Sequence, residues 1–173
     1  MFKSVRASSA LMCAAPAALL LAAVPTAAAP VGPHASLCAA GKPAVLARVS
    51  GFKAPRGVLT VKLYASNQST FLEKGAYLRK VEVPVNRSGP IDVCVPVPAA
   101  QGRYALSVRH EVTGDKSRLD GGGFSGNPNV SLVDVALKRK PSMNAVSFQV
   151  NGTTRVVPVV LNYIQGGSLR PVS

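Results

Sequence analysis

The sequence contains no tryptophan, and phenylalanine and tyrosine bring its aromatic content to only 5%. Acidic residues are also few, because seven Asp and Glu stand against 20 Lys and Arg and leave a formal net charge of +13. So few aromatic rings give no sign of a surface for stacking nucleic-acid bases, and we expect no specific nucleic-acid partner. The shortage of acids excludes a protein that would repel polyanions.

The chain is long enough for one domain. Of its 173 residues, 47% are hydrophobic and 16% are charged, which is enough apolar material for a folded core. We divide the chain into a secretory signal peptide at residues 1–29, a flexible lead-in at 30–43, a single folded domain at 44–164 and a C-terminal tail at 165–173. The lead-in is rich in Pro, Gly and Ala and carries no recognisable chemistry.

Three features of residues 1–29 are typical of a secretory signal peptide. Lys3 and Arg6 give a basic start, an apolar run extends from Ala10 to Val24, and small residues follow up to Ala29. The run is shorter than the roughly 20 apolar residues of a membrane-spanning helix. We therefore expect an exported protein, periplasmic or secreted, that does not span a membrane.

Beyond residue 44, apolar and polar residues alternate in short runs that Gly, Pro, Asn and Ser interrupt. This period of two is typical of half-buried strands, and no stretch predicts a long helix. We therefore expect an all-β fold, an antiparallel two-sheet sandwich of about seven strands. Pro96 and Pro158 lie inside two of these runs, so we place each at a sheet edge or a bulge. The runs span residues 45–49, 59–63, 81–85, 91–97, 104–110, 146–150 and 157–163.

Two cysteines, Cys38 and Cys94, remain after the signal peptide, and they lack the paired spacing of a metal site. In an oxidising compartment an even number most simply forms one disulfide bond, and two unpaired buried thiols are the alternative. Alternation places Ile91 and Val93 inward and Cys94 outward. The bond would therefore join the segment around Cys38 to an outer face or a sheet edge.

A long polar segment follows the run that ends at His110. Residues 114–129 include GGGFSGNP, and a loop of this length is either functional or mobile.

Several of these features together resemble a known family. The strings FLEKGAYLRKVEVPV, GRYALSVRHE and GGGFSGNP, together with the two cysteines and the export signal, resemble the bacterial exported proteins of domain-of-unknown-function family 2141. The resemblance covers the chain from about Ala44 to Tyr163. It implies a secreted, largely periplasmic sandwich domain, similar to immunoglobulin-like or transthyretin-like modules, with no established activity. The family pattern His-Asp-x-Asn-x-Asn with a later Asp is matched here by His110, Glu111, Thr113, Asp115 and Asp120.

The loop after His110 carries oxygen atoms in the pattern that a hard cation such as calcium requires. The candidate ligands are Glu111, Thr113, Asp115 and Asp120. Three basic residues between positions 109 and 118 lie among them and raise the electrostatic cost of binding a cation. We therefore predict no cofactor, with calcium in this loop as the alternative. The competing interpretation of the loop is a turn in which Asp and Thr side chains bind local amides.

His110 ends a core-facing row that begins at Tyr104. It would serve as the general base if the protein were a small hydrolase or a metal-dependent enzyme centred on His110 and the 111–120 loop, which is our alternative function. The competing interpretation is a histidine at the margin of the core, hydrogen-bonded to a loop carbonyl. Because no G-x-S-x-G motif is present, the sequence favours a protein that is not an enzyme.

The basic surplus is the one feature that points to a partner. Lys138, Arg139 and Lys140 form a run, and Arg79 and Lys80 add charge elsewhere. Such a surface attracts polyanions. We therefore predict a non-catalytic binding or structural module of the cell envelope, whose partner is an envelope polyanion or another protein. A basic surface without a partner is the remaining interpretation, and the sequence indicates no oligomeric state.

Overall fold

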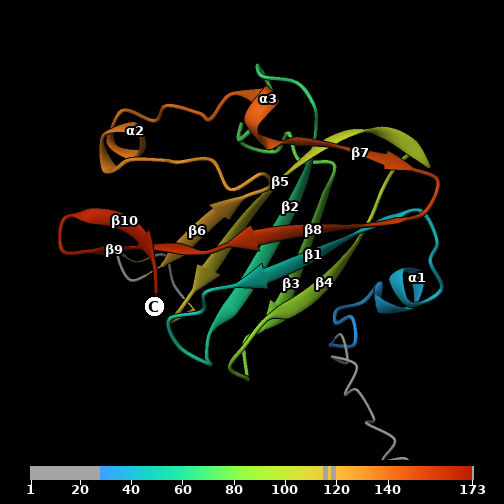
Figure 1. The fold of residues 1–173 in the computed structure, drawn as a ribbon, viewed down its shortest axis with the longest axis horizontal. Coiled ribbons are helices and arrows are strands. Elements are labelled where there is room, and N and C mark those ends of the chain that lie inside the picture. Colours follow the sequence, from blue (N-terminus) through green and yellow to red (C-terminus); the bar gives the residue numbers. More distant parts are fainter. Residues whose placement is uncertain (1–27, 115–116, 118–119, 173) are drawn as a thin grey trace, which may run out of the picture.

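A computed structural model describes residues 28–114, 117 and 120–172 (Figure 1). The predicted signal peptide lies outside these residues except for its last two positions. The described part forms ten strands and three short helices. In chain order they are α1 (Ala35–Ala39), β1 (Ala44–Ser50), β2 (Val58–Ala65), β3 (Arg79–Pro84), β4 (Ile91–Pro96), β5 (Gln101–Glu111), β6 (Gly121–Phe124), α2 (Leu132–Ala136), α3 (Met143–Val146), β7 (Ser147–Asn151), β8 (Thr154–Val160), β9 (Asn162–Gln165) and β10 (Ser168–Pro171).

The strands form two sheets. The smaller sheet has the order β4-β1-β8, and the larger has the order β10-β9-β6-β5-β2-β3, with β7 also paired to β5. The pairs between these strands are antiparallel except β1 with β8, which is parallel. The prediction of an all-β two-sheet sandwich is confirmed. The run 157–163, expected as one strand, divides into β8 in the smaller sheet and β9 in the larger one.

Alternating side chains build the core between the two sheets. In β2, Leu59, Val61 and Leu63 are fully buried, whereas Thr60 and Lys62 lie on the opposite face. Inward residues of the other strands, mostly Val and Leu, complete the same cluster. Burial of each such side chain contributes about 1.5–3 kcal/mol relative to exposure. The larger sheet therefore has one face in the core, and its other face carries the site described below.

The two strand prolines lie where their missing N–H does least harm. Pro96 is in β4 and Pro158 is in β8, and these are the two edge strands of the smaller sheet. Their expected edge positions are confirmed, because a proline on an edge strand removes no hydrogen bond from the interior of a sheet.

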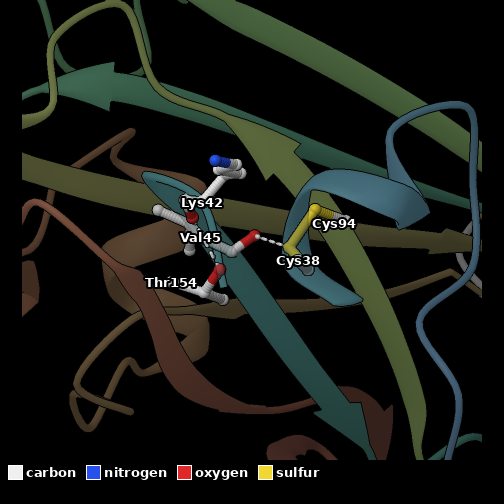
Figure 2. The surroundings of a disulfide bond; sticks show 5 residues. All are labelled: Cys38, Lys42, Val45, Cys94 and Thr154. Carbon is white, nitrogen blue, oxygen red and sulfur yellow. Dashed lines mark hydrogen bonds between the residues drawn. A yellow bond between two sulfur atoms is a disulfide. The ribbon is translucent and has the colours of Figure 1, made fainter. Parts of the chain in front are cut away.

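Where we expected a flexible lead-in at residues 30–43, the structure has the helix α1 and two attachments to the smaller sheet. Cys38 and Cys94 form a disulfide bond, as predicted (Figure 2). Val31 exchanges backbone hydrogen bonds with β4, since its N–H donates to the Asp92 carbonyl oxygen at 2.8 Å and its carbonyl oxygen accepts from the Cys94 N–H at 3.3 Å. Pro, Gly and Ala composition predicts flexibility, but these attachments order the segment.

The polar segment 114–129 also differs from the expected loop, because Gly121–Phe124 forms strand β6 beside β5. Two of its glycines lie so close to other parts of the chain that a side chain would not fit. A Cβ atom on Gly121 would lie 2.4 Å from the Tyr163 ring, and one on Gly123 would lie 2.6 Å from the Val160 carbonyl oxygen. Glycine has a low strand propensity, so local sequence hid a strand that packing requires. Part of the expected C-terminal tail likewise forms β10, which pairs with β9.

In the described part of the chain, no helix is both long enough and apolar enough to cross a membrane. Helix α2 lies outside the two layers, beyond β6 (Figure 1), and none of its residues is buried.

Candidate functional site

A groove of about 590 Å³ crosses the outer face of the larger sheet. Its floor consists of outward side chains that strand pairing places in two rows. The lysine row contains Lys80, Lys62, Ser107 and Phe124, on β3, β2, β5 and β6. The arginine row contains Glu82, Thr60, Arg109, Gly122 and Asn162, on β3, β2, β5, β6 and β9. Apolar side chains, among them Leu72, Val135, Ile164 and Leu169, complete the lining.

Charged groups in the groove are mostly paired with each other. The Lys80 Nζ lies 2.8 Å from Glu82 Oε1, and the Thr60 hydroxyl donates to the same oxygen at 3.1 Å. These hydrogen bonds hold the pKa of Glu82 below its usual value, and the bond from Lys80 has the largest effect. Lys62 pairs with no carboxylate of the described residues, and its ammonium lies 5.3 Å from the centre of the Tyr77 ring.

Arg109 organises the acids at one end of the groove. It forms ion pairs with Glu111, at 3.3 Å from Nε to Oε1, and with Asp120. Asp120 also accepts hydrogen bonds from the backbone N–H of Ser117, at 3.0 Å, and from its hydroxyl, at 3.1 Å. Burial acts to raise the pKa of Asp120, but the hydrogen bonds from Ser117 and Arg109 together bring it below its usual value.

The predicted calcium ligands are only partly placed. Glu111 and Asp120 both face Arg109, Thr113 lies in the turn after β5, and Asp115 lies outside the described residues. Within the part of the chain that the structure describes, no three His, Cys, Asp or Glu side chains gather as a metal site would require. The guanidinium of Arg109 occupies the position between two of the proposed ligands, and calcium binding here stays a prediction.

His110 lies on the face of β5 opposite the groove and is fully buried. Its Nδ1 lies 2.6 Å from the Tyr163 hydroxyl, and its Nε2 lies 2.8 Å from the carbonyl oxygen of Arg56. The Tyr163 hydroxyl in turn accepts from the Lys53 N–H at 3.2 Å. Because a carbonyl oxygen only accepts, Nε2 carries the hydrogen. This is the bond to a loop carbonyl that the competing interpretation of His110 expects. Glu111, the next residue of β5, points to the opposite face and so lies away from the His110 ring.

The predicted polyanion-binding residues lie on two segments that contacts of Lys140 join, and we call this set of residues the basic end. Arg79 and Lys80 begin β3, and Lys140 contacts Ser69 and Glu73 of the loop that leads into this strand. Arg139 pairs with Asp134 at 3.7 Å. Lys138 closes α2 with a φ of 52°, and neither it nor Arg79 pairs with a carboxylate in the described part. The basic end consists of Arg79, Lys80, Lys138, Arg139 and Lys140.

Sequence reasoning did not identify the groove. Alternation in β2 placed Thr60 and Lys62 on a shared outer face, which was the available signal. The sequence carries no signal for the hollow over β6, because the glycines of this strand are typical of a loop.

Comparison with known proteins identifies the family. The family described as an uncharacterized protein conserved in bacteria (DUF2141) matches residues 47–157. The chain belongs to this family. The match covers the last part of β1, strands β2 to β7 and most of β8, and so includes the β2, β3, β5 and β6 positions of both groove rows. No curated protein and no solved structure matches the chain significantly.

Proposed function

We propose that this DUF2141 member is an exported, non-catalytic binding module of the cell envelope that holds an anionic polymer or surface at its basic end. The export signal in the sequence and the disulfide bond support a place outside the cytoplasm.

The observation that carries the proposal is the distribution of charge. Each of the six described acids, Glu73, Glu82, Asp92, Glu111, Asp120 and Asp134, forms an ion pair. These pairs engage only Arg48, Lys80, Arg109, Arg139 and Lys140. The remaining described cations have no carboxylate partner in the described part, and they are Lys42, Lys53, Arg56, Lys62, Lys74, Arg79, Arg87, Arg103, Lys138, Arg155 and Arg170. A surface with this surplus attracts polyanions in a salt-dependent way.

The basic end is the favoured contact because its charges come from two separate segments that meet there. Lys140 joins the loop before β3 through Glu73, and Lys138 and Arg79 add cations that no carboxylate of the described part neutralises. Each cation close to an anionic surface contributes about 1 kcal/mol to binding.

The test measures binding of the oxidised protein to polygalacturonate, an acidic polysaccharide, at low and moderate salt. The double variant Lys138→Gly and Arg79→Gln removes two of these cations, and glycine suits the backbone at position 138. We expect about 30-fold weaker binding, as two losses of 1 kcal/mol imply.

The matched control is Arg87→Gln with Arg155→Gln, which removes the same charge elsewhere and should change binding by no more than about twofold. Equal weakening by both double variants would show that net charge, and not the basic end, is responsible. Binding that salt does not weaken, or that an uncharged polysaccharide matches, would refute the proposal. Anionic and neutral lipid vesicles in parallel distinguish a glycan from a lipid source.

A further inference from the structure

The floor of the groove is hollow at a position where the fold does not require glycine. Gly121 and Gly123 point into the packed interior, where a Cβ atom would collide with Tyr163 or with the backbone at Val160. Gly122 points the other way. A Cβ atom there would meet only the Val108 carbonyl oxygen, at 3.8 Å, which is ordinary contact. Its backbone also lacks the positive φ that favours glycine. Neither packing nor conformation accounts for the missing side chain.

One end of the groove offers a cation and hydroxyl groups. Lys62 lies directly opposite Lys80 across β2 and β3 and opposite Ser107 across β2 and β5. Lys80 is held by Glu82, whereas Lys62 pairs with no carboxylate of the described residues. Ser107 and Tyr64, which also line the groove, carry the hydroxyl groups. Two facing lysines with one neutralising acid leave room for one further negative group.

Aliphatic side chains form another part of the lining, beside the polar groups around Arg109. Val135 of α2 and Ile164 of β9 line the groove and are 54% and 45% exposed, so they leave apolar surface in contact with water. Phe124 ends the lysine row, and Leu169 lies beside Ile164 across β10 and β9. The aromatic rings of the lining give no flat exposed platform, because Tyr64 is buried and Phe124 half-buried. This part of the lining suits a hydrocarbon better than a sugar ring.

We propose that the groove over Gly122 binds an amphiphilic anion, with its phosphate or carboxylate at Lys62 and Ser107 and its hydrocarbon part over Gly122 against Val135 and Ile164. Lys62 on β2 and Gly122 on β6 are two strand spacings apart, about 10 Å across the sheet at the usual strand spacing. A single short alkyl chain with one anionic head fits this length and this division of polarity.

The groove and the basic end share Lys80, but the two proposals are tested at different residues. The groove depends on Lys62 and Gly122, which the polysaccharide test leaves intact. The Lys138→Gly and Arg79→Gln protein should therefore bind the amphiphile as the unmodified protein does.

The test is calorimetric titration with decyl phosphate below its micelle concentration, with inorganic phosphate and uncharged octyl glucoside as comparison probes. We expect decyl phosphate to bind at one site, at least about tenfold more tightly than either comparison probe. Gly122→Val fills the hollow, and Lys62→Met removes the charge but keeps an apolar stem. Each should weaken binding about tenfold or more. Arg155→Met on β8 is the matched control and should change nothing.

Thermal unfolding of Gly122→Val near the temperature of the unmodified protein would show that the fold is intact, and Lys62→Met keeps the test decisive if it is not. Unchanged affinity in both variants would overturn the site. Equal binding of octyl glucoside would refute the anionic part, and equal binding of inorganic phosphate would refute the hydrocarbon part. No heat at millimolar decyl phosphate would overturn the proposal as a whole.

Discussion

Breaking the Cys38–Cys94 bond should lower the stability of the domain substantially. The bond joins two residues 56 positions apart in the sequence. In the chain-entropy model, closing a loop of this length lowers the entropy of the unfolded chain and so raises the free energy of unfolding by about 4 kcal/mol. Because the described domain has an unfolding entropy of about 0.3 kcal/mol per kelvin, this loss corresponds to a fall in Tm of about 13 °C.

Part of the attachment of α1 survives without the bond. Val31 keeps its two backbone hydrogen bonds to β4, and the Thr154 hydroxyl keeps its bond to the Lys42 carbonyl oxygen at 2.7 Å (Figure 2). The Sγ atoms themselves lie in a small buried cluster with Ala44 and Leu46. The fold of the two sheets should therefore persist, with a lower free energy of unfolding and with faster amide exchange in α1.

The assay compares urea unfolding of the oxidised protein, the protein reduced with dithiothreitol, and the variant Cys38→Ala with Cys94→Ala. The reduced protein retains both side chains, so it separates loop closure from lost packing. A decrease below about 1 kcal/mol in the reduced protein, with α1 amides still protected, would refute the loop-closure reasoning. A large decrease in the alanine variant alone would attribute the effect to packing.

Two further predictions concern the site's surroundings. Gly121→Ala should lower the free energy of unfolding in urea by about 3 kcal/mol, because the new Cβ atom would displace the Tyr163 ring. Gly122→Ala should lower it by less than about 0.5 kcal/mol. Equal losses would contradict the assignment of the two glycines to opposite faces. Asp120→Asn should cost about 2 kcal/mol at pH 7 through its lost bonds to Arg109 and Ser117. Since the pKa of Asp120 is lowered in the folded state, this contribution is present at neutral pH and is lost as the pH falls below about 4, so stability curves of the two proteins should converge there.

The strands that sequence predicted are those whose own residues carry the signal. In β2 and β5 each inward Val or Leu alternates with a polar residue, and strand type, face and approximate ends follow directly. Strand β6 could not be found in this way, because its glycines are determined by Tyr163 and Val160, far along the chain. The same limit applies to residues 30–43, whose order comes from partners in β4.

The candidate site shows the same division. The outward position of Lys62 was predictable. That it has no carboxylate partner among the described residues was not, because Glu82 pairs with Lys80, two residues away on β3, and not with Lys62 on the neighbouring strand. Alternation along β4 places Asp92 on the outer face, where a charged side chain is usually solvated. It is 1% exposed and held by Arg48 through two hydrogen bonds, of 3.0 and 2.8 Å, under the segment that leads into α1.

The outer faces of the two sheets differ in a way that bears on where a ligand can bind. On the smaller sheet, α1 lies against Cys94, to which the disulfide bond joins it, and Arg48 donates hydrogen bonds to the carboxylate of Asp92. Cys94 and Asp92 are both buried, so this part of the face is closed to a ligand. On the larger sheet, a hollow persists over Gly122 beside exposed Val135 and Ile164. Exposed aliphatic side chains leave apolar surface in water, which costs free energy. A larger side chain at position 122 could cover part of this surface at little steric cost. A ligand that covers the aliphatic side chains would remove this free-energy cost, and our proposal of an amphiphilic anion on the outer face of the larger sheet rests on this difference between the two faces.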